Sequence, residues 1–210
     1  MDSLPETQAL NDNNPVLSDG TVYSRRLNHR PFSSRPPEAY IPIVGEERIE
    51  RLLDISRQYQ GLRLLELNST AQGGGVAEML YNSVPFLDTL GIDTEWKIIN
   101  GHTSYYESTK LLHNLLQGMK GSFTPEMKHA YLEQMKVCVQ NSIINRPYDV
   151  INVNDPQPML LCRHLKNGEH WIWRCHIDIE PSVRAQNGLF VRIFVGVSLK
   201  DMAPVHDLPS

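Results

Sequence analysis

Hydrophobic positions alternate between helical and strand spacing along the middle of the chain. From Glu46 onward, apolar residues such as Ile49 and Leu52 recur at helical spacing, which predicts a helix. Leu62–Asn68 is a short apolar run typical of a buried strand, and a polar, glycine-rich stretch follows it. Residues 76–82 return to helical spacing. A strand, a glycine-rich turn and a helix in this order open a nucleotide-binding α/β unit.

The rest of the chain continues this alternation. Gly91 precedes one strand, Gly118 closes one helix, and Thr124-Pro125-Glu126 is a typical helix start. The further predicted strands are 94–99, 148–153 and 171–179, and the further predicted helices are 108–116, 124–139 and 159–165. Because strands alternate with helices, we predict an α/β fold with an open, mostly parallel sheet flanked by helices.

The pattern divides the chain into three parts. Residues 39–180 carry the predicted elements and form one domain, which begins with a short extended segment at 40–44. Residues 1–38 are rich in loop-forming residues and predict a disordered or extended tail. This tail is either a solvated extension or, given its arginines, a docking arm. Residues 181–210 hold one apolar run, 189–197, and then a polar end, which predicts an atypical C-terminal tail.

Composition and charge narrow the function classes. The 210 residues carry a net charge of −4 at pH 7 and the pI is about 6.1, so the chain lacks the basic footprint of a nucleic-acid or anionic-lipid binder. No apolar run approaches the roughly 18–20 residues of a membrane-spanning helix, and residues 1–14 do not read as a secretory signal. Cys138, Cys162 and Cys175 are too widely spaced for a disulfide framework or a zinc pattern. We therefore expect a cytoplasmic protein with buried, reduced thiols.

Three consecutive glycines, Gly73, Gly74 and Gly75, stand between the first predicted strand and its helix. Glycines allow the backbone to approach a ligand closely, and the N–H groups at a helix N-terminus bind anions. The spacing matches neither the dinucleotide-binding fingerprint nor the lysine-containing phosphate loop, so ATP hydrolysis is not expected. Taken alone, the segment fits a ligand-binding loop and a tight strand-to-helix turn equally well.

Polar residues also follow two later strands, at the edge where open α/β sheets bind ligands. Asp155 and Gln157 lie in a proline-rich segment after one strand, and the alternative is an ordinary turn with Asp as its cap. On the last predicted strand, Arg174 and His176 are two residues apart, so both side chains are expected on the same face. Asp178 stands near the end of this strand. We favour a ligand contact for His176 over a core histidine. No second ligand stands at a spacing typical of a metal site.

Three polar residues, His113, Asn114 and Gln117, interrupt an otherwise apolar helix. Asn114 and Gln117 are three residues apart and share one face of the helix. They predict either a ligand contact or a solvent-facing stripe.

In their order along the chain, these segments resemble the N-terminal motifs of trehalose synthases of the glycosyltransferring type. The resemblance covers roughly residues 40–180 and rests on five blocks, which together are specific although each alone is not. The blocks are Leu67–Leu80, Gly91–Trp96, Thr109-Lys110 with His113–Gly118, Asp155–Pro158 and Trp171–Asp178.

The resemblance implies a retaining glycosyltransferase with two facing Rossmann-like domains, of which residues 39–180 would be the N-terminal, acceptor-side one. Such enzymes transfer glucose from a nucleotide-diphosphate glucose to free glucose and make α,α-trehalose. They need no metal and no cofactor beyond the donor substrate. The implied partners are therefore sugar and nucleotide-sugar substrates, with no nucleic acid and no membrane.

The resemblance also assigns roles to individual residues. The loop Gly73–Gly75 would approach the transferred sugar and the diphosphate. His176 would be the catalytic, strand-end histidine that contacts the donor sugar. The other implied substrate-binding residues are Glu78, Asp155, Gln157, Arg174 and Asp178, with Asn114 and Gln117 on the acceptor side.

Two departures from the family pattern matter. Asn154 stands where the family usually has His, and an amide forms hydrogen bonds but cannot take up a proton. After about residue 179 the pattern dissolves, so the donor-side domain is expected to be absent and the chain inactive alone. One alternative is a non-catalytic carbohydrate-binding or interaction fragment that pairs with a separate donor domain. Another is a response-regulator-like module, for which Asp155 lacks an acidic cluster. The possible protein partners are a separate donor domain or further copies of the chain in a homo-oligomer.

Overall fold

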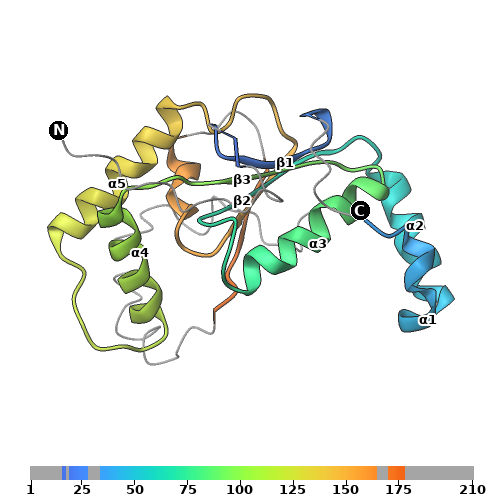
Figure 1. The fold of residues 1–210 in the computed structure, drawn as a ribbon, viewed down its shortest axis with the longest axis horizontal. Coiled ribbons are helices and arrows are strands. Elements are labelled where there is room, and N and C mark those ends of the chain that lie inside the picture. The colour runs from blue at the N-terminus through green and yellow to red at the C-terminus, as the bar shows by residue number, and fades with distance from the viewer. Residues whose placement is uncertain (1–15, 18, 28–33, 165–169, 178–210) are drawn as a thin grey trace.

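The sheet is the part of the predicted architecture that the structure confirms most directly. The computed structural model describes residues 16–17, 19–27, 34–164 and 170–177. The strands in these residues form one sheet in the order β1-β3-β2-β4-β5 (Figure 1). The parallel strands are β2 (Arg63–Asn68), β3 (Asp93–Ile98), β4 (Val150–Asn154) and β5 (His170–Arg174), and β1 (Thr21–Ser24) pairs antiparallel with β3.

The helices follow the predicted order. The four long ones are α2 (Glu46–Gln58), α3 (Gly75–Thr89), α4 (Thr103–Leu116) and α5 (Pro125–Gln140). The short ones are α1 (Ile41–Val44) and the 3-10 turns Arg25–Leu27, Pro37–Tyr40 and Met159–Arg163. Thr124 caps α5 as its sequence indicates, since its hydroxyl accepts a hydrogen bond from the N–H of Met127 at 3.3 Å. None of the helices in the described residues is long and apolar enough to cross a membrane.

The two faces of the sheet are covered by different helices. The alternation along β2 and β3 sends Leu65 and Leu67 to one face and Trp96 and Ile98 to the other. Helices α4 and α5 lie side by side over the first face, and α3 packs on the second (Figure 1). Burying a leucine side chain stabilises the fold by about 1.5–3 kcal/mol. The sheet is thus packed on both faces, and the carboxyl ends of its parallel strands lie together at one open end of the sheet.

Two segments differ from the predicted structure. Residues 21–24, predicted within a tail, form the buried edge strand β1. The hydroxyl of Tyr23 donates to Asp88 at 2.6 Å and that of Ser24 to Glu95 at 2.9 Å. Residues 40–44, predicted to be extended, are helical because a proline in the first turn is compatible with a helix start.

Candidate functional site

The loop between β2 and α3 leaves open space in front of the helix N-terminus. Gly73 and Gly74 have φ angles of 75° and 90°, a region that residues with a Cβ rarely adopt. A Cβ added at Gly73, Gly74 or Gly75 would meet nothing within 4 Å. Gly74 is the N-cap of α3 and offers no side-chain oxygen to the first-turn N–H groups. These donors and the positive end of the helix dipole therefore suit a polar or anionic ligand group.

The turn after β4 is held in place by two buried tyrosines. Tyr131 donates its hydroxyl to the carbonyl of Pro156 at 2.7 Å, and Tyr105 donates to the carbonyl of Gln157 at 3.1 Å. Burial raises the pKa of both hydroxyls, so they stay protonated and remain donors. Asp155 has a φ of 63°, in the left-handed region that Asp tolerates better than most residues. The turn is thus anchored to α4 and α5.

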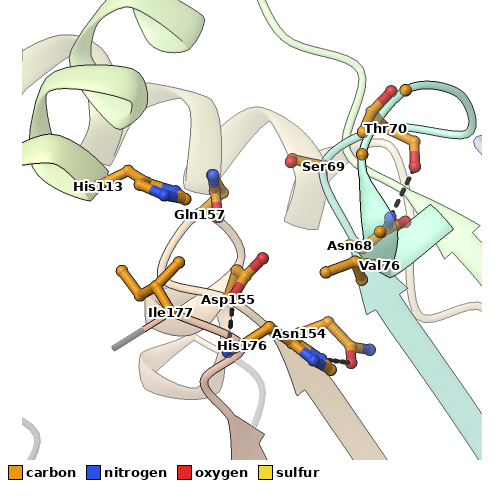
Figure 2. Close-up of a pocket in the computed structure, with 13 residues that line it drawn as sticks. Asn68, Ser69, Thr70, Val76, His113, Asn154, Asp155, Gln157, His176 and Ile177 are labelled. Atoms are coloured by element: carbon orange, nitrogen blue, oxygen red, sulfur yellow. Dashed lines mark hydrogen bonds between the residues drawn. The ribbon is translucent and has the colours of Figure 1, made fainter. Parts of the chain in front are cut away.

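His176 follows β5 and is tied to the β4 side by two hydrogen bonds. Its backbone N–H donates to Oδ1 of Asp155 at 2.9 Å, and its ring Nε2 lies 2.7 Å from Oδ1 of Asn154 (Figure 2). Burial lowers the pKa of the imidazole below its usual 6.5; Arg174 acts in the same direction and Asp155 opposes it. The ring is therefore neutral at pH 7 and can donate one hydrogen bond and accept another.

These three segments line one pocket of about 480 Å³ at the carboxyl ends of β2, β4 and β5. Open α/β sheets bind their ligands at this edge. Figure 2 shows His113 and Gln157 on one side of the pocket, Asp155 and His176 below them, and Ser69 across from them. The pocket therefore joins segments that are about a hundred residues apart in the chain.

Six of the predicted site residues line this pocket, namely Gly73, Gly74, Gly75, Asp155, Gln157 and His176. Four others do not line it: Glu78 is exposed on α3, Asn114 is half-buried on α4, Gln117 is exposed just after α4, and Arg174 is the exposed last residue of β5. Because β5 ends at Arg174, earlier than predicted, His176 is placed by its hydrogen bonds and not by strand alternation. Asp178 lies outside the described residues.

The pocket also contains residues that the predicted site omits. They are Asn68, Ser69, Thr70, Val76, His113, Asn154 and Ile177. Asn68 is the last residue of β2 and Ser69 and Thr70 follow it, and their place between a strand end and three glycines could have identified them. His113 precedes Asn114 by one residue, which turns it about 100° around the helix, and only the packing of α4 shows which side faces the pocket.

Within the described residues, no group of three or more His, Cys, Asp or Glu side chains is placed to hold a metal ion. Cys138 and Cys162 are buried, Cys175 is half-buried, and none of the three forms a disulfide bond within the described residues.

The fold defines a Rossmann-like α/β domain with a pocket at the carboxyl ends of its strands. Comparison with known families then shows to which family of such domains the chain belongs. Residues 66–198 match the family described as "Trehalose synthase, N-terminal domain", and the chain belongs to this family. The match continues past residue 180, where the predicted domain ended.

Curated relatives agree with this assignment. The trehalose synthase of Pyrococcus horikoshii is 39% identical over 169 residues, which cover 78% of this chain and 40% of the relative. The trehalose synthase of Rubrobacter xylanophilus is 37% identical over 143 residues, covering 66% of this chain and 34% of the relative. The trehalose phosphorylase of Pleurotus pulmonarius is 32% identical over 128 residues, which cover 55% of this chain and 17% of the relative. The chain thus spans about two fifths of the length of the first of these relatives and belongs to a family of trehalose-metabolising glycosyltransferases.

Proposed function

We propose that the pocket takes part in glucose transfer from a nucleotide-diphosphate glucose to glucose, as the acceptor-side wall of a trehalose synthase-like cleft. The observation that carries this proposal is the meeting of the glycine loop, the turn at Gln157 and His176 around one pocket. Membership of the trehalose synthase family supports the sugar and nucleotide-sugar substrates.

The two sides of the pocket suit the diphosphate and the glucose of a nucleotide-diphosphate glucose donor. The first residues of α3 line the pocket, and a Cβ at Gly73, Gly74 or Gly75 would meet no atom within 4 Å, so a diphosphate can approach the N–H groups at the helix start. On the other side, His176 and Gln157 offer hydrogen bonds to sugar hydroxyls. The buried side-chain oxygen of Gln157 has no hydrogen-bond partner among the described residues, and a sugar hydroxyl would satisfy it.

In the proposed reaction, the bond between C1 of the donor glucose and the diphosphate breaks. A new bond forms between C1 and a hydroxyl oxygen of the acceptor glucose, with retention of configuration. The proton of that hydroxyl passes to the departing diphosphate. The neutral His176 holds the donor sugar through a hydrogen bond, and the α3 N-terminus stabilises the negative diphosphate, so the scheme invokes no metal or cofactor.

Transfer also requires a second wall that holds the donor against the acceptor. Correct positioning of two reactants can be worth about 7–11 kcal/mol of the barrier. We propose that the donor-side wall comes from a second domain or chain, and that the 210-residue chain alone shows no measurable transfer.

The test is a transfer assay with glucose and a panel of ADP-, GDP- and UDP-glucose. The chain is assayed alone and together with the separately produced C-terminal part of a trehalose synthase. We expect trehalose only in the mixture, formed about 10-fold more slowly when the chain carries His176→Ala. Trehalose made by the chain alone would contradict the need for a second wall. Sugar binding without transfer in any mixture would favour a non-catalytic carbohydrate-binding fragment.

A further inference from the structure

We infer that Asn154 and Glu66 are positioning residues that hold the ring of His176 in the tautomer with hydrogen on Nε2. Nδ1 is then offered to the pocket ligand as a hydrogen-bond acceptor. The identity of that ligand, a sugar with a donating hydroxyl, rests on the proposed function. The tautomer itself follows from contacts within the chain.

The first step is the orientation of the Asn154 amide, which is fully buried at the end of β4. Its Nδ2 lies 2.7 Å from Oε2 of Glu66 and 3.2 Å from the carbonyl oxygen of Leu67. A backbone carbonyl only accepts hydrogen bonds, whatever the charge on Glu66. The reversed amide would place two oxygens against each other in a buried site, which is costly. The nitrogen of Asn154 therefore faces Leu67 and Glu66.

The second step fixes the histidine. With Nδ2 committed, Oδ1 of Asn154 is the atom that faces the imidazole, at 2.7 Å from Nε2 of His176. Because this oxygen can only accept, Nε2 must carry the hydrogen. In a neutral ring the other nitrogen, Nδ1, then has a lone pair. No described residue forms a hydrogen bond with Nδ1, and the side chain lines the pocket (Figure 2).

Glu66 anchors this arrangement from the neighbouring strand. It is 5% exposed on β2, where it is the sheet partner of Asn152 on β4. Nδ2 of Asn152 lies 3.1 and 2.9 Å from its two oxygens, in addition to the contact with Asn154. Burial raises the pKa of Glu66, and the two amides and Arg174 oppose this. A buried carboxyl with several amide donors fixes the position of its partners, because each lost contact would leave a buried polar group unsatisfied.

The chain offers a matched control for this network. Asn152 and Asn154 lie two residues apart on the same face of β4, and both donate to Glu66. Only Asn154 also contacts His176. Replacing each by leucine therefore removes the same chemical group and the same kind of Glu66 contact, but changes the histidine contact in one case only.

The experiment measures the ring ¹⁵N signals of His176 in the full chain, labelled with ¹⁵N-histidine, at pH 7.5. The His176→Gln variant assigns the signals. We expect a single Nε2–H tautomer in the wild type and in Asn152→Leu. In Asn154→Leu we expect a mixture of the two tautomers, because the acceptor that selects one of them is gone.

A wild-type spectrum with hydrogen on Nδ1, or a folded Asn154→Leu chain that keeps a pure Nε2–H tautomer, would overturn the inference. If Asn154→Leu does not fold, the wild-type spectrum tests the tautomer and the Glu66 variants test the anchoring role. Glu66→Gln keeps an acceptor oxygen for Asn154, and Asn152 can reverse its amide because its own oxygen has no partner among the described residues. We therefore expect Glu66→Gln to keep the tautomer and Glu66→Leu to lower the fraction with hydrogen on Nε2; the opposite order would contradict the anchoring role.

The readout also separates this inference from the proposed function. A chain with the expected tautomer that supports no glucose transfer would contradict the function and leave the positioning role intact. Transfer activity in a chain with hydrogen on Nδ1 of His176 would support the function and contradict the positioning role.

Discussion

The carboxylate of Asp155 accepts a hydrogen bond from the backbone N–H of His176 at 2.9 Å, which links the turn after β4 to the chain after β5. The backbone of Asp155 strengthens this link, because its N–H donates to the carbonyl of Arg174 at 2.9 Å and its carbonyl accepts from Nε1 of Trp173 at 3.0 Å. One residue thus lines the pocket and also holds His176 in place.

Replacing Asp155 tests how much its side-chain hydrogen bond and its left-handed φ contribute to stability. We expect Asp155→Ala to lower the free energy of unfolding by about 2 kcal/mol. The loss of the side-chain acceptor contributes about 1 kcal/mol, and a left-handed φ for a residue that tolerates it less well contributes about 1 kcal/mol more. Asp155→Asn keeps an oxygen and tolerates the same φ, so we expect a change within about 0.5 kcal/mol. Urea denaturation measures both, and equal losses in the two variants would contradict the account.

The glycine loop offers a second matched pair. Gly74 has a φ of 90°, whereas Gly75 begins α3, and a methyl group would meet no atom within 4 Å at either position. We expect Gly74→Ala to destabilise the chain by about 1–2 kcal/mol through backbone strain alone. Gly75→Ala should be neutral or stabilising by up to about 1 kcal/mol. Thermal unfolding compares the two, and a stability loss at Gly75 as large as that at Gly74 would show that backbone conformation is not the cause.

His176 should affect turnover much more than stability. In the transfer mixture described above, we expect His176→Ala to lower kcat/KM by about 10-fold or more, as the loss of one hydrogen bond of about 1.4 kcal/mol predicts. Its free energy of unfolding should fall by only about 1 kcal/mol, the cost of the lost contact with Asn154, because the backbone contact with Asp155 remains. A variant that keeps full turnover, or that unfolds, would contradict the assignment of His176 as a ligand contact.

The lowered pKa of His176 also predicts a pH dependence of stability. Its folded pKa lies below the usual 6.5, so the unfolded chain takes up this proton first as the pH falls. The folded state therefore loses stability from this group between pH 6.5 and the lowered pKa. The difference in unfolding free energy between the wild type and His176→Gln should change across this window and stay constant above it. A constant difference at all pH values would contradict the burial of the ring.

Asp149 predicts a separate effect in acid. Hydrogen bonds from the guanidinium and the backbone N–H of Arg63 lower the pKa of this carboxyl to about 2. Its stabilising effect is full above the ordinary pKa of 3.8 and is lost as the pH falls through about 2. Asp149→Asn should flatten the acid limb of the stability curve and cost at most about 1 kcal/mol at pH 7, because the pair is partly exposed.

The sequence predicted those parts of the fold that depend on local pattern. The buried run before Asn68, the glycine turn and the cap at Thr124 each specify their own local structure. The four-residue strand β1 carries too short a pattern to be recognised, and it is defined by long-range contacts such as that between Ser24 and Glu95. An edge strand of this kind cannot be read from periodicity alone.

Pocket-lining residues were predictable where a glycine-rich or proline-rich segment follows a strand, as with Gly73–Gly75 and Gln157. It was not predictable where tertiary packing decides, as with His113, which faces the pocket while the neighbouring Asn114 does not. The contact between Asn154 and Glu66 joins two strands, and nothing in either local segment indicates it.

Binding at the strand-end pocket is the central claim, and an NMR titration of the ¹⁵N-labelled chain tests it most directly. Glucose and the three nucleotide-diphosphate glucoses are added in turn, with mannitol as a control polyol. The account predicts that amide shifts gather at Gly73–Gly75, Gln157 and His176, that they saturate, that they are absent with mannitol, and that His176→Ala weakens the binding they report by about 10-fold. Saturating shifts confined to residues outside the pocket, or no shifts with any of these sugars, would contradict it.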